Sequence, residues 1–410
     1  MQVNNTFTHC LLCLEQFQEV HVVLGNEACD LDSMVSSLVY AFSFFKVQRQ
    51  LFYRKSPLFW DYLNCTRWKV MKIPLGRLSV IYRRDVTLSS SRGSSVAVIP
   101  VFNIPQQDFR LRTEAVFLFG RCNIDPDLFT FNDDIELQTL LDAKRLKLVL
   151  VDHNVLSQAQ RHMDVAVVEI LDHHKDMWPS NLKVKKTIEL VGSCSTLVAE
   201  KLLPLEILDS QMAHLLLGTI LLDTINLDPR AGRSTHKDIE IVKQLQDKYP
   251  VDLDELYTAL SQAKFDVAGL STRDLLRKDY KALPKHNNKT PAVGISALSG
   301  LSMGEFFLRD RVQDDILVYC QTAALLDVLV VMFVHFPDGY KEPPQRQIAV
   351  CGPCEDLRTN IARYLEASVE LQLIEYSECP QDCFLYDQGN ITATRKVVFP
   401  LVNDFLQSQL

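Results

Sequence analysis

The order of residues 22–36 constrains the fold more than any other feature of this sequence. An apolar run over 22–24 leads into a polar loop, and Ser33 then begins a segment with the apolar spacing of a helix. This order predicts a buried strand, a loop and a helix. In open α/β sheets, ligands bind just beyond the carboxyl ends of the strands, where this loop would lie. Three side chains of the loop carry oxygen and are candidate ligands: Asn26, Asp30 and Asp32.

Asp32 or Ser33 could also act only as a helix N-cap, and Asp30 as a solvated turn residue. Three later apolar runs favour the ligand interpretation, because each leads into a side chain that can bind a metal. The runs 146–151, 166–171 and 212–222 are followed by Asp152, by Asp172-His173-His174 and by Asp223, respectively. Strand-like runs that alternate with helices predict an α/β fold with a mostly parallel, covered sheet.

If these runs end on one side of the sheet, four carboxylates and one imidazole converge there: Asp30, Asp32, Asp152, His173 and Asp223. Four carboxylates so close would repel one another strongly without cations between them. An oxygen-rich set with one imidazole suits Mg²⁺ or Mn²⁺ better than Zn²⁺. Two such ions about 3.5–4 Å apart can bridge a water and clamp the oxygens of a phosphoryl transfer. Asp152 would bridge them.

The histidines next to these ligands have alternative roles. His174 is either a surface histidine at a helix start or a proton donor to a leaving phosphate. Asp172 could orient a histidine from outside the ligand set. We expect His153 to be structural or an outer partner rather than a ligand.

A polar stretch over 228–255 predicts two domains, residues 1–255 and 256–410. Within the first, 115–119 reads as a short strand; within the second, four runs do: 292–297, 316–321, 328–336 and 347–351. Residues 48–95 break the pattern, with ten basic residues against two acidic ones. We interpret this stretch as an insertion, poorly ordered or partly docked and without a catalytic role. The alternative is that it binds nucleic acid or polyphosphate.

Composition limits the class of protein. The net charge of −8 argues against general nucleic-acid binding, and no apolar run reaches the roughly 18–20 residues that cross a membrane. The first twenty residues lack a secretory or transit signal. Many of the eleven cysteines sit in apolar stretches, which predicts a reducing, cytoplasmic location. Cys351 with Cys354 and Cys379 with Cys383 have spacings that could hold zinc, but 347–351 reads as a strand and 355–370 as the helix after it, which argues against a zinc site.

Four ordered motifs resemble those of the DHH phosphoesterase superfamily, and within it the prune proteins. The motifs are Gly-Asn-Glu-Ala-Cys-Asp-Leu-Asp-Ser (25–33), Val-Asp-His-Asn (151–154), Leu-Asp-His-His (171–174) and Gly-Thr-Ile-Leu-Leu-Asp-Thr (218–224). The resemblance covers nearly the whole chain except 48–95. It implies a parallel-sheet DHH domain, then a smaller α/β DHHA2-type domain, with the active site in the cleft between them. Relatives include short-chain exopolyphosphatases and family II inorganic pyrophosphatases.

The resemblance also implies roles for individual residues. Asn26, Asp30 and Asp152 would hold one divalent cation, and Asp32, Asp152, His173 and Asp223 the other, with His174 as general acid. Arg395, Lys396 and Lys281 would bind substrate phosphates, although each could instead be a solvated charge. Asn26 stands where the pyrophosphatases carry histidine, so a carbonyl oxygen replaces an imidazole nitrogen and Mg²⁺ becomes more acceptable.

This set of motifs predicts a metal-dependent hydrolase of short polyphosphates. Hydrolysis of cyclic nucleotides (cyclic AMP or cyclic GMP) is the alternative substrate class, because prune proteins are linked with phosphodiesterase activity. A second alternative is a regulatory protein that binds nucleoside diphosphate kinase and has little catalysis of its own.

Overall fold

The structure is a computed structural model. It describes Leu14 and residues 17–55, 70–72, 79–84, 95–179, 182–284, 290–337, 343–376 and 382–408. Cys379 and most of the predicted insertion lie outside these ranges. The chain divides into two compact units, Met1–Ala263 and Lys264–Leu410. Within the described ranges, no helix is long and apolar enough to cross a membrane.

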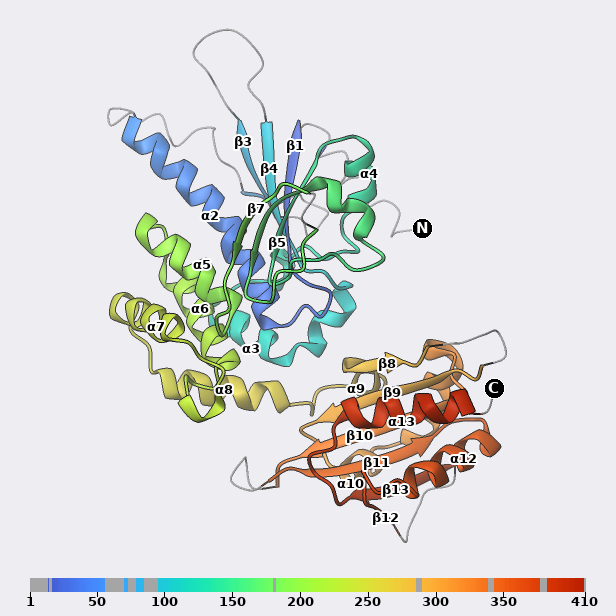
Figure 1. Cartoon of the computed structure of the whole chain (residues 1–410). Helices are drawn as coiled ribbons and strands as arrows, with labels where there is room; N and C mark the ends of the chain where they lie inside the picture. Colours follow the sequence, from blue (N-terminus) through green and yellow to red (C-terminus); the bar gives the residue numbers. More distant parts are fainter. Residues whose placement is uncertain are drawn as a thin grey trace. The chain divides into compact units, whose positions relative to one another are not determined.

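A seven-stranded sheet forms the centre of the first unit, in the order β2-β3-β4-β1-β5-β6-β7. Five of its strands are parallel: β4 (Ser95–Val101), β1 (Glu19–Leu24), β5 (Leu146–Val151), β6 (Val167–Asp172) and β7 (Lys185–Ile188). Figure 1 shows β1, β4 and β5 side by side. This confirms the predicted α/β fold with a mostly parallel sheet.

The edge of this sheet includes two segments from within residues 48–95. Helix α2 (Leu31–Lys55) continues into residues 48–95. Two later segments of the same stretch are strands, β2 (Val70–Lys72) and β3 (Ser79–Arg84). Strand β3 pairs antiparallel with both β2 and β4. Part of the predicted insertion therefore extends the sheet. The local sequence has no period of 2 and therefore did not predict these strands. They form because they pair with neighbouring strands.

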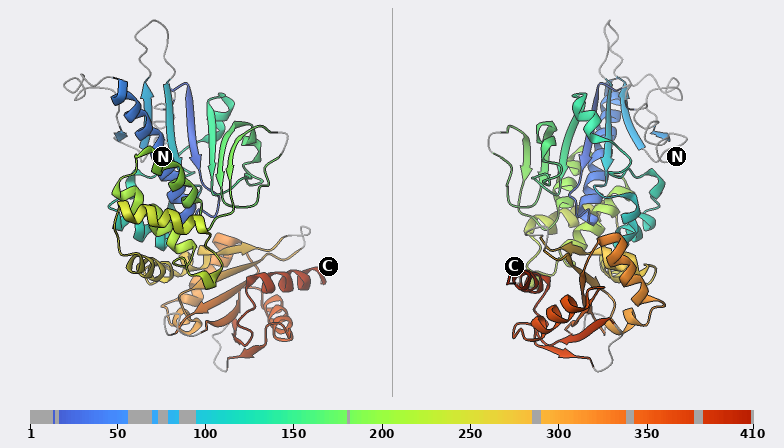
Figure 2. Two further views of the ribbon diagram at one scale, coloured as in Figure 1. Left: turned by 60° about the vertical axis from the view of Figure 1, so that its left-hand side comes forward. Right: turned by 90° about the vertical axis from the view of Figure 1, so that its right-hand side faces the viewer.

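Each face of the sheet has its own core, because alternate side chains of a strand point to opposite faces. Val23 and Val149 belong to one apolar cluster, together with residues of α2, α5 (Cys194–Leu202), α6 (Ser210–Asp223) and α7 (His236–Lys248). Leu24 and Leu148 belong to the other, with residues of α4 (Leu137–Asp142). Figures 1 and 2 show α5, α6 and α7 grouped on one side of the sheet, and α8 (Leu253–Phe265) follows them.

The predicted strand over 115–119 is wrong, because α3 (Thr113–Arg121) occupies these residues. Its buried side chains, Ala115, Leu118 and Phe119, recur at helical spacing and join the same cluster as α2 and α6. A five-residue apolar run fits a buried strand and a buried helix equally well, and here tertiary packing decided.

A six-stranded sheet forms the second unit, in the order β12-β13-β11-β10-β9-β8. The strands are β8 (Tyr280–Ala282), β9 (Val293–Ser299), β10 (Val328–His335), β11 (Gln345–Cys351), β12 (Leu373–Glu375) and β13 (Cys383–Gln388). Only β9 and β10 pair in parallel. Helices α12 (Glu355–Glu366) and α13 (Arg395–Ser408) pack together against one face, with Tyr364 and Phe405 5.2 Å apart between ring centres.

Three shorter helices complete the second unit: α9 (Thr272–Lys278), α10 (Met303–Phe307) and α11 (Val312–Val318). The predicted strand over 316–321 is wrong, because α11 and a π-helical turn (Tyr319–Ala324) cover it. Val312, Ile316 and Tyr319 are buried at helical spacing, while Val318 is exposed. The spacing of its buried side chains marks this segment as a helix with one apolar face.

Candidate metal centre

The first unit collects acidic and histidine side chains where three adjacent parallel strands end. The loop after β1 carries Asn26 and Asp30, Asp152 follows β5, and His173 follows Asp172, the last residue of β6. Asp152 has a left-handed backbone (φ 60°), a conformation uncommon for residues other than glycine. This conformation ends β5 at the residue that carries the candidate ligand carboxylate.

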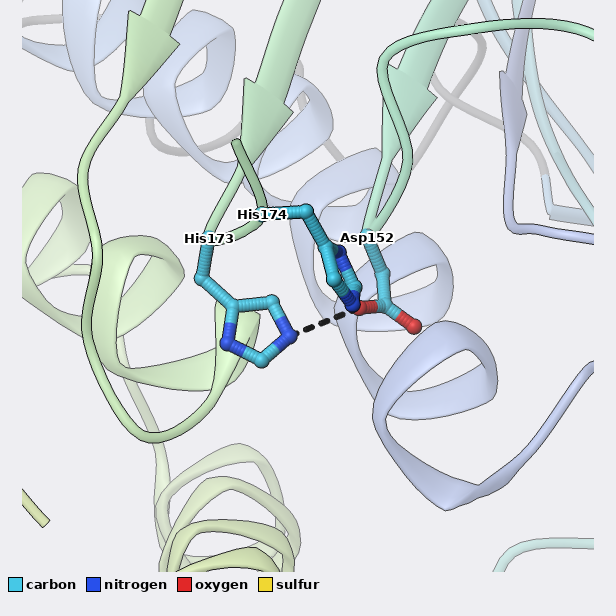
Figure 3. A group of neighbouring side chains, drawn as sticks. All are labelled: Asp152, His173 and His174. Carbon is cyan, nitrogen blue, oxygen red and sulfur yellow. Dashed lines mark ion pairs between the residues drawn. The ribbon is translucent and has the colours of Figure 1, made fainter. Parts of the chain in front are cut away.

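Asp152, His173 and His174 form a compact group of possible ligands. Their candidate atoms all lie within 4.8 Å of one another. His173 Nε2 is 3.2 Å and His174 Nδ1 is 4.0 Å from Asp152 Oδ1. Figure 3 shows both imidazole rings turned toward the Asp152 carboxylate. The strand ends β5 and β6 therefore bring together two of the predicted ligands and the predicted proton donor.

The other carboxylate oxygen of Asp152 faces the loop after β1. Ser33 Oγ donates to Asp152 Oδ2 at 2.6 Å, and Asn26 Nδ2 donates to the same atom at 2.9 Å. Asn26 Oδ1 accepts from the backbone N–H of Cys29. The assigned amide orientation therefore turns the NH₂ group of Asn26, and not its carbonyl oxygen, toward Asp152. Arg112 holds this loop from outside by donating to the carbonyl oxygen of Ala28.

Asp32 lies in the first turn of α2 and contacts the start of another helix. It accepts from the backbone N–H groups of Cys194 (2.6 Å) and Ser195 (2.9 Å) at the N-terminus of α5. Backbone N–H groups without helical partners stabilise a carboxylate at this position. Asp32 Oδ2 is also 3.9 Å from His173 Nε2. Asp32 thus lies beside the group formed by Asp152 and His173.

Asp223, the last residue of α6, has a buried Oδ2 atom without a hydrogen-bond partner. Burial first, and then the charges of Asp32, Asp30 and Asp152, raise the pKa of Asp223 well above its usual range. A buried carboxylate oxygen without a donor is costly unless a proton or a cation compensates it. This oxygen fits the role of a metal ligand.

The pKa shifts of the central pair reflect the same crowding. Burial and the charges of Asp32 and Asp30 raise the pKa of Asp152 to about 7, although His173 and Ser33 oppose the shift. Burial favours neutral His173, but its hydrogen bond to Asp152 and the charge of Asp32 outweigh burial and raise its pKa to about 10. In this arrangement protons occupy places that cations can take.

His174 belongs to a second hydrogen-bonded chain. Its Nδ1 is 2.9 Å from Asp172 Oδ1, and this bond is the main reason that the pKa of His174 is raised. Asn154 donates to the other oxygen of Asp172, and Asn154 Oδ1 accepts from Met177 N–H. The His174 side chain is 58% exposed. His153 instead bonds to the carbonyl oxygen of Val151, which is consistent with the expected structural role.

Sequence reasoning did not assign roles to three of these polar residues: Ser33 as a donor to Asp152, Ser195 as a donor to Asp32, and Asn154 as a donor to Asp172. Ser33 and Asn154 lie in the quoted motifs, so motif membership was the available signal for these two, whereas Ser195 lies outside the four motifs. Their partners are 119, 163 and 18 residues away along the chain.

The predicted phosphate-binding residues lie in the second unit. Lys281, Arg395 and Lys396 line one pocket of about 600 Å³, and Arg346, which the sequence analysis did not single out, lines it too. Arg395 Nη2 is 2.7 Å from Asp279 Oδ1, so one acidic residue balances part of the positive charge. The pocket offers a cationic surface suited to an anion.

Comparisons with known proteins identify the family of this chain. A family model described as the DHHA2 domain matches residues 258–405. Exopolyphosphatase PRUNE1 of Bos taurus is 36% identical over 413 residues, which cover 99% of this chain and 80% of that protein. A manganese-dependent inorganic pyrophosphatase of Methanothrix thermoacetophila is 31% identical over 148 residues, 35% of this chain and 46% of that protein.

One solved structure, described as a family II inorganic pyrophosphatase of Methanococcus jannaschii, aligns with a TM-score of 0.45 and 15% identity, over 93% of this chain and 99% of that one. The similarity to PRUNE1 extends over both units, and the DHHA2 match lies almost wholly in the second. The chain therefore belongs to the family of the PRUNE1 exopolyphosphatases.

Proposed function

We propose that this chain hydrolyses phosphoanhydride bonds of short polyphosphates with the help of two divalent cations, Mg²⁺ or Mn²⁺. The single observation that carries the proposal is the excess of buried negative charge at the strand ends. Burial and the charge of Asp32 raise the pKa values of both Asp152 and Asp223 there, and one oxygen of Asp223 has no donor. Hard divalent cations are the natural complement of such an oxygen-rich set.

The proposed ligands divide into two sets that share Asp152. Asn26, Asp30 and Asp152 would hold one cation, and Asp32, Asp152, His173 and Asp223 the other. Asn26 would bind through its carbonyl oxygen, which requires the opposite amide orientation and releases the bond to Cys29 N–H. When bound, two cations supply an activated water and stabilise negative charge on the phosphate.

His174 is the proposed proton donor to the leaving phosphate. Asp172 accepts from Nδ1, which fixes the tautomer and leaves Nε2 to carry the mobile proton. The raised pKa of His174 keeps this proton available near neutral pH. Asn154 fixes Asp172 in turn, so the donor is oriented by two successive partners.

Lys281, Arg395 and Lys396 are the proposed binding residues for substrate phosphates. A phosphate chain carries negative charge along its whole length, and guanidinium groups bind such oxygens in pairs. Arg346 adds a fourth cation to the same pocket. We propose that it contacts a phosphate farther along the chain.

The decisive experiment measures phosphate release from tripolyphosphate, pyrophosphate and cyclic AMP with Mg²⁺ or Mn²⁺. Wild type is compared with Asp152→Ala and with Asp164→Ala, a control aspartate just before β6. We expect phosphate release from tripolyphosphate, and we expect Asp152→Ala to reduce its rate more than about 100-fold. That loss is larger than the one expected from substituting a residue that only contacts a metal ligand. The control variant should retain full activity.

Other outcomes separate the alternatives. Release mainly from cyclic AMP would overturn the polyphosphate substrate and favour the phosphodiesterase prediction. If the protein binds the cation but releases phosphate from none of these substrates, the regulatory prediction is favoured. In that prediction, which follows from the resemblance, the chain binds nucleoside diphosphate kinase and has little catalysis of its own. Pull-down of that kinase by the same preparation would then test the regulatory prediction directly.

A further inference from the structure

The second unit contains two buried thiols that face each other across neighbouring strands. Cys351 ends β11 and Cys383 begins β13, and the antiparallel register pairs the two residues directly. Their Sγ atoms are 2.7 Å apart. We propose that Cys351 and Cys383 form a reversible dithiol–disulfide site, which mild oxidants such as peroxides convert to the disulfide. The proposal is independent of the proposed hydrolase activity.

The backbone is already suited to a covalent link. Directly opposed residues of antiparallel strands have Cα atoms about 4.5–5.5 Å apart, within the range of about 4.4–6.8 Å found for disulfides. Both thiols are free, with Cys351 fully buried and Cys383 9% exposed. Because the sulfur atoms are closer than ordinary van der Waals contact, little backbone movement is needed to join them.

A buried arginine holds the two chain segments in place beside the thiols. Arg358 donates to the carbonyl oxygen of Gly352, which follows Cys351, and to Asp382 Oδ1 at 3.1 Å, which precedes Cys383. Gly352 has a φ of +134°, and a Cβ atom there would lie 2.7 Å from the carbonyl oxygen of Asp327. The turn after Cys351 is therefore fixed by both a charged contact and a glycine.

An oxidant can reach the pair. A cavity of about 230 Å³ is lined by Cys351, Cys383, Gly352 and Asp382 on one side and by Ile316 and Leu317 of α11 on the other. Its volume exceeds that of several waters, so hydrogen peroxide fits. Cys383 is the more accessible sulfur. Burial and the contact with Cys383 raise the pKa of Cys351 well above its usual range, so Cys383 is the sulfur expected to react first.

The redox step balances in two stages. The Cys383 sulfur attacks one peroxide oxygen, the O–O bond breaks, and a sulfenic acid and one water form. The Cys351 sulfur then attacks the sulfenic sulfur, the S–S bond forms, and a second water leaves. Two thiols lose two electrons and two protons, and hydrogen peroxide is reduced to two waters. A dithiol such as dithiothreitol reverses the change by exchange.

Two neighbouring cysteines offer competing pairings. Cys354 is partly exposed at the start of α12, and Cys320 is buried in the π-helical turn after α11. The spacings of 351–354 and 379–383 would also suit zinc. Within the described ranges, however, Asp152, His173 and His174 are the single group of three or more possible ligands that meets at one point. The geometry favours the pair over a metal site.

The test is peptide mapping of the full-length chain after treatment with hydrogen peroxide and alkylation of the remaining thiols. Cleavage after arginine and lysine places Cys351 in peptide 347–358 and Cys383 in peptide 364–395. We expect these peptides to be linked, with a mass loss of two hydrogens that dithiothreitol reverses. Since the peptides also contain Cys354 and Cys379, the variant carrying Cys354→Ser and Cys379→Ser must keep the link. Cys320→Ser is the matched buried control and should also keep it.

Three results would overturn the proposal. The first is a link that persists in Cys383→Ser or Cys383→Ala. The second is full alkylation of both Cys351 and Cys383 in the oxidised, folded double variant Cys354→Ser/Cys379→Ser. The third is one equivalent of zinc in the purified chain that Cys383→Ala removes. Circular dichroism verifies folding, and the double variant retains both proposed sulfurs, so the test does not depend on a destabilised protein.

Discussion

The strand ends of the first unit and the cationic pocket of the second unit differ in the sign of their charge and in their exposure to water. At the strand ends, burial and the charge of Asp32 shift the pKa values of Asp152 and Asp223 upward. In the pocket, Lys281 and Lys396 are exposed, and Asp279 pairs with Arg395. Buried like charges need counterions or protons, whereas exposed charges are stabilised by water.

This difference teaches which region depends on a ligand for its stability. The strand ends are held by fixed donors, including Ser33, Asn26 and the backbone of α5, and the remaining negative charge calls for cations. The exposed charges of the cationic pocket can remain hydrated without a ligand. We therefore expect substitutions of the buried carboxylates in the first region to change catalysis and stability together, and those in the second region to change substrate binding alone.

The largest effect within this comparison is expected at His174. His174→Gln removes the proposed proton donor from an exposed side chain, so kcat should fall about 10²–10⁴-fold without loss of folding or cation binding. Steady-state kinetics with tripolyphosphate measure the change. His162→Gln, an exposed histidine of the same unit, is the matched control and should leave kcat unchanged. Wild-type kcat in His174→Gln would exclude the proposed donor role.

A smaller effect is expected in the cationic pocket. Arg395→Gln with Lys396→Gln should raise KM about 10–100-fold, the loss of one or two charge-assisted hydrogen bonds, while the metal affinity stays the same. Arg363→Gln, an exposed arginine on α12, controls for a general loss of positive charge. An unchanged KM at low salt would contradict phosphate binding by this pocket.

The pH dependence of cation binding sharpens the contrast further. In the metal-free protein, His173 with a pKa of about 10 is protonated at pH 7, and Asp152 with a pKa of about 7 is half protonated. Cation binding must displace these protons, so affinity should rise nearly 100-fold per pH unit near pH 6, where about two protons are displaced, and about tenfold per unit near pH 8, where about one is. Calorimetry in two buffers of different ionisation enthalpy measures the released protons. Asp152→Asn should release fewer, and pH-independent binding would contradict the coupling.

The smallest effect concerns stability without cations. A folded-state pKa raised above the unfolded value makes Asp223 destabilising at every pH above that unfolded value, and the loss grows as pH rises. Asp223→Asn should therefore stabilise the metal-free protein at pH 7, and less at pH 4. Thermal unfolding in a chelator measures this. Saturating Mg²⁺ or Mn²⁺ should stabilise the wild type more than the variant. A metal-free variant less stable than the metal-free wild type would contradict the destabilising effect of Asp223.

The sequence alone predicted a mostly parallel first sheet and named the candidate ligands that follow its strands. Apolar runs that end in Asp152 or Asp172 are local patterns, and the ends of parallel strands must meet at one edge. Local periodicity failed at 115–119 and 316–321, where short apolar runs fold as helices. Such runs carry no period long enough to separate the two structures, so the packing partner decided.

Tertiary structure alone decided the contacts between residues distant in the chain. The bond from Ser195 to Asp32 and the pairing of Cys351 with Cys383 depend on which strands and helices become neighbours. Strand register is set by cross-strand packing and by turns, and a shift of one residue would have turned these thiols to opposite faces of the sheet. The sequence supplied the chemical groups of both sites, and packing supplied their distances, burial and pKa values.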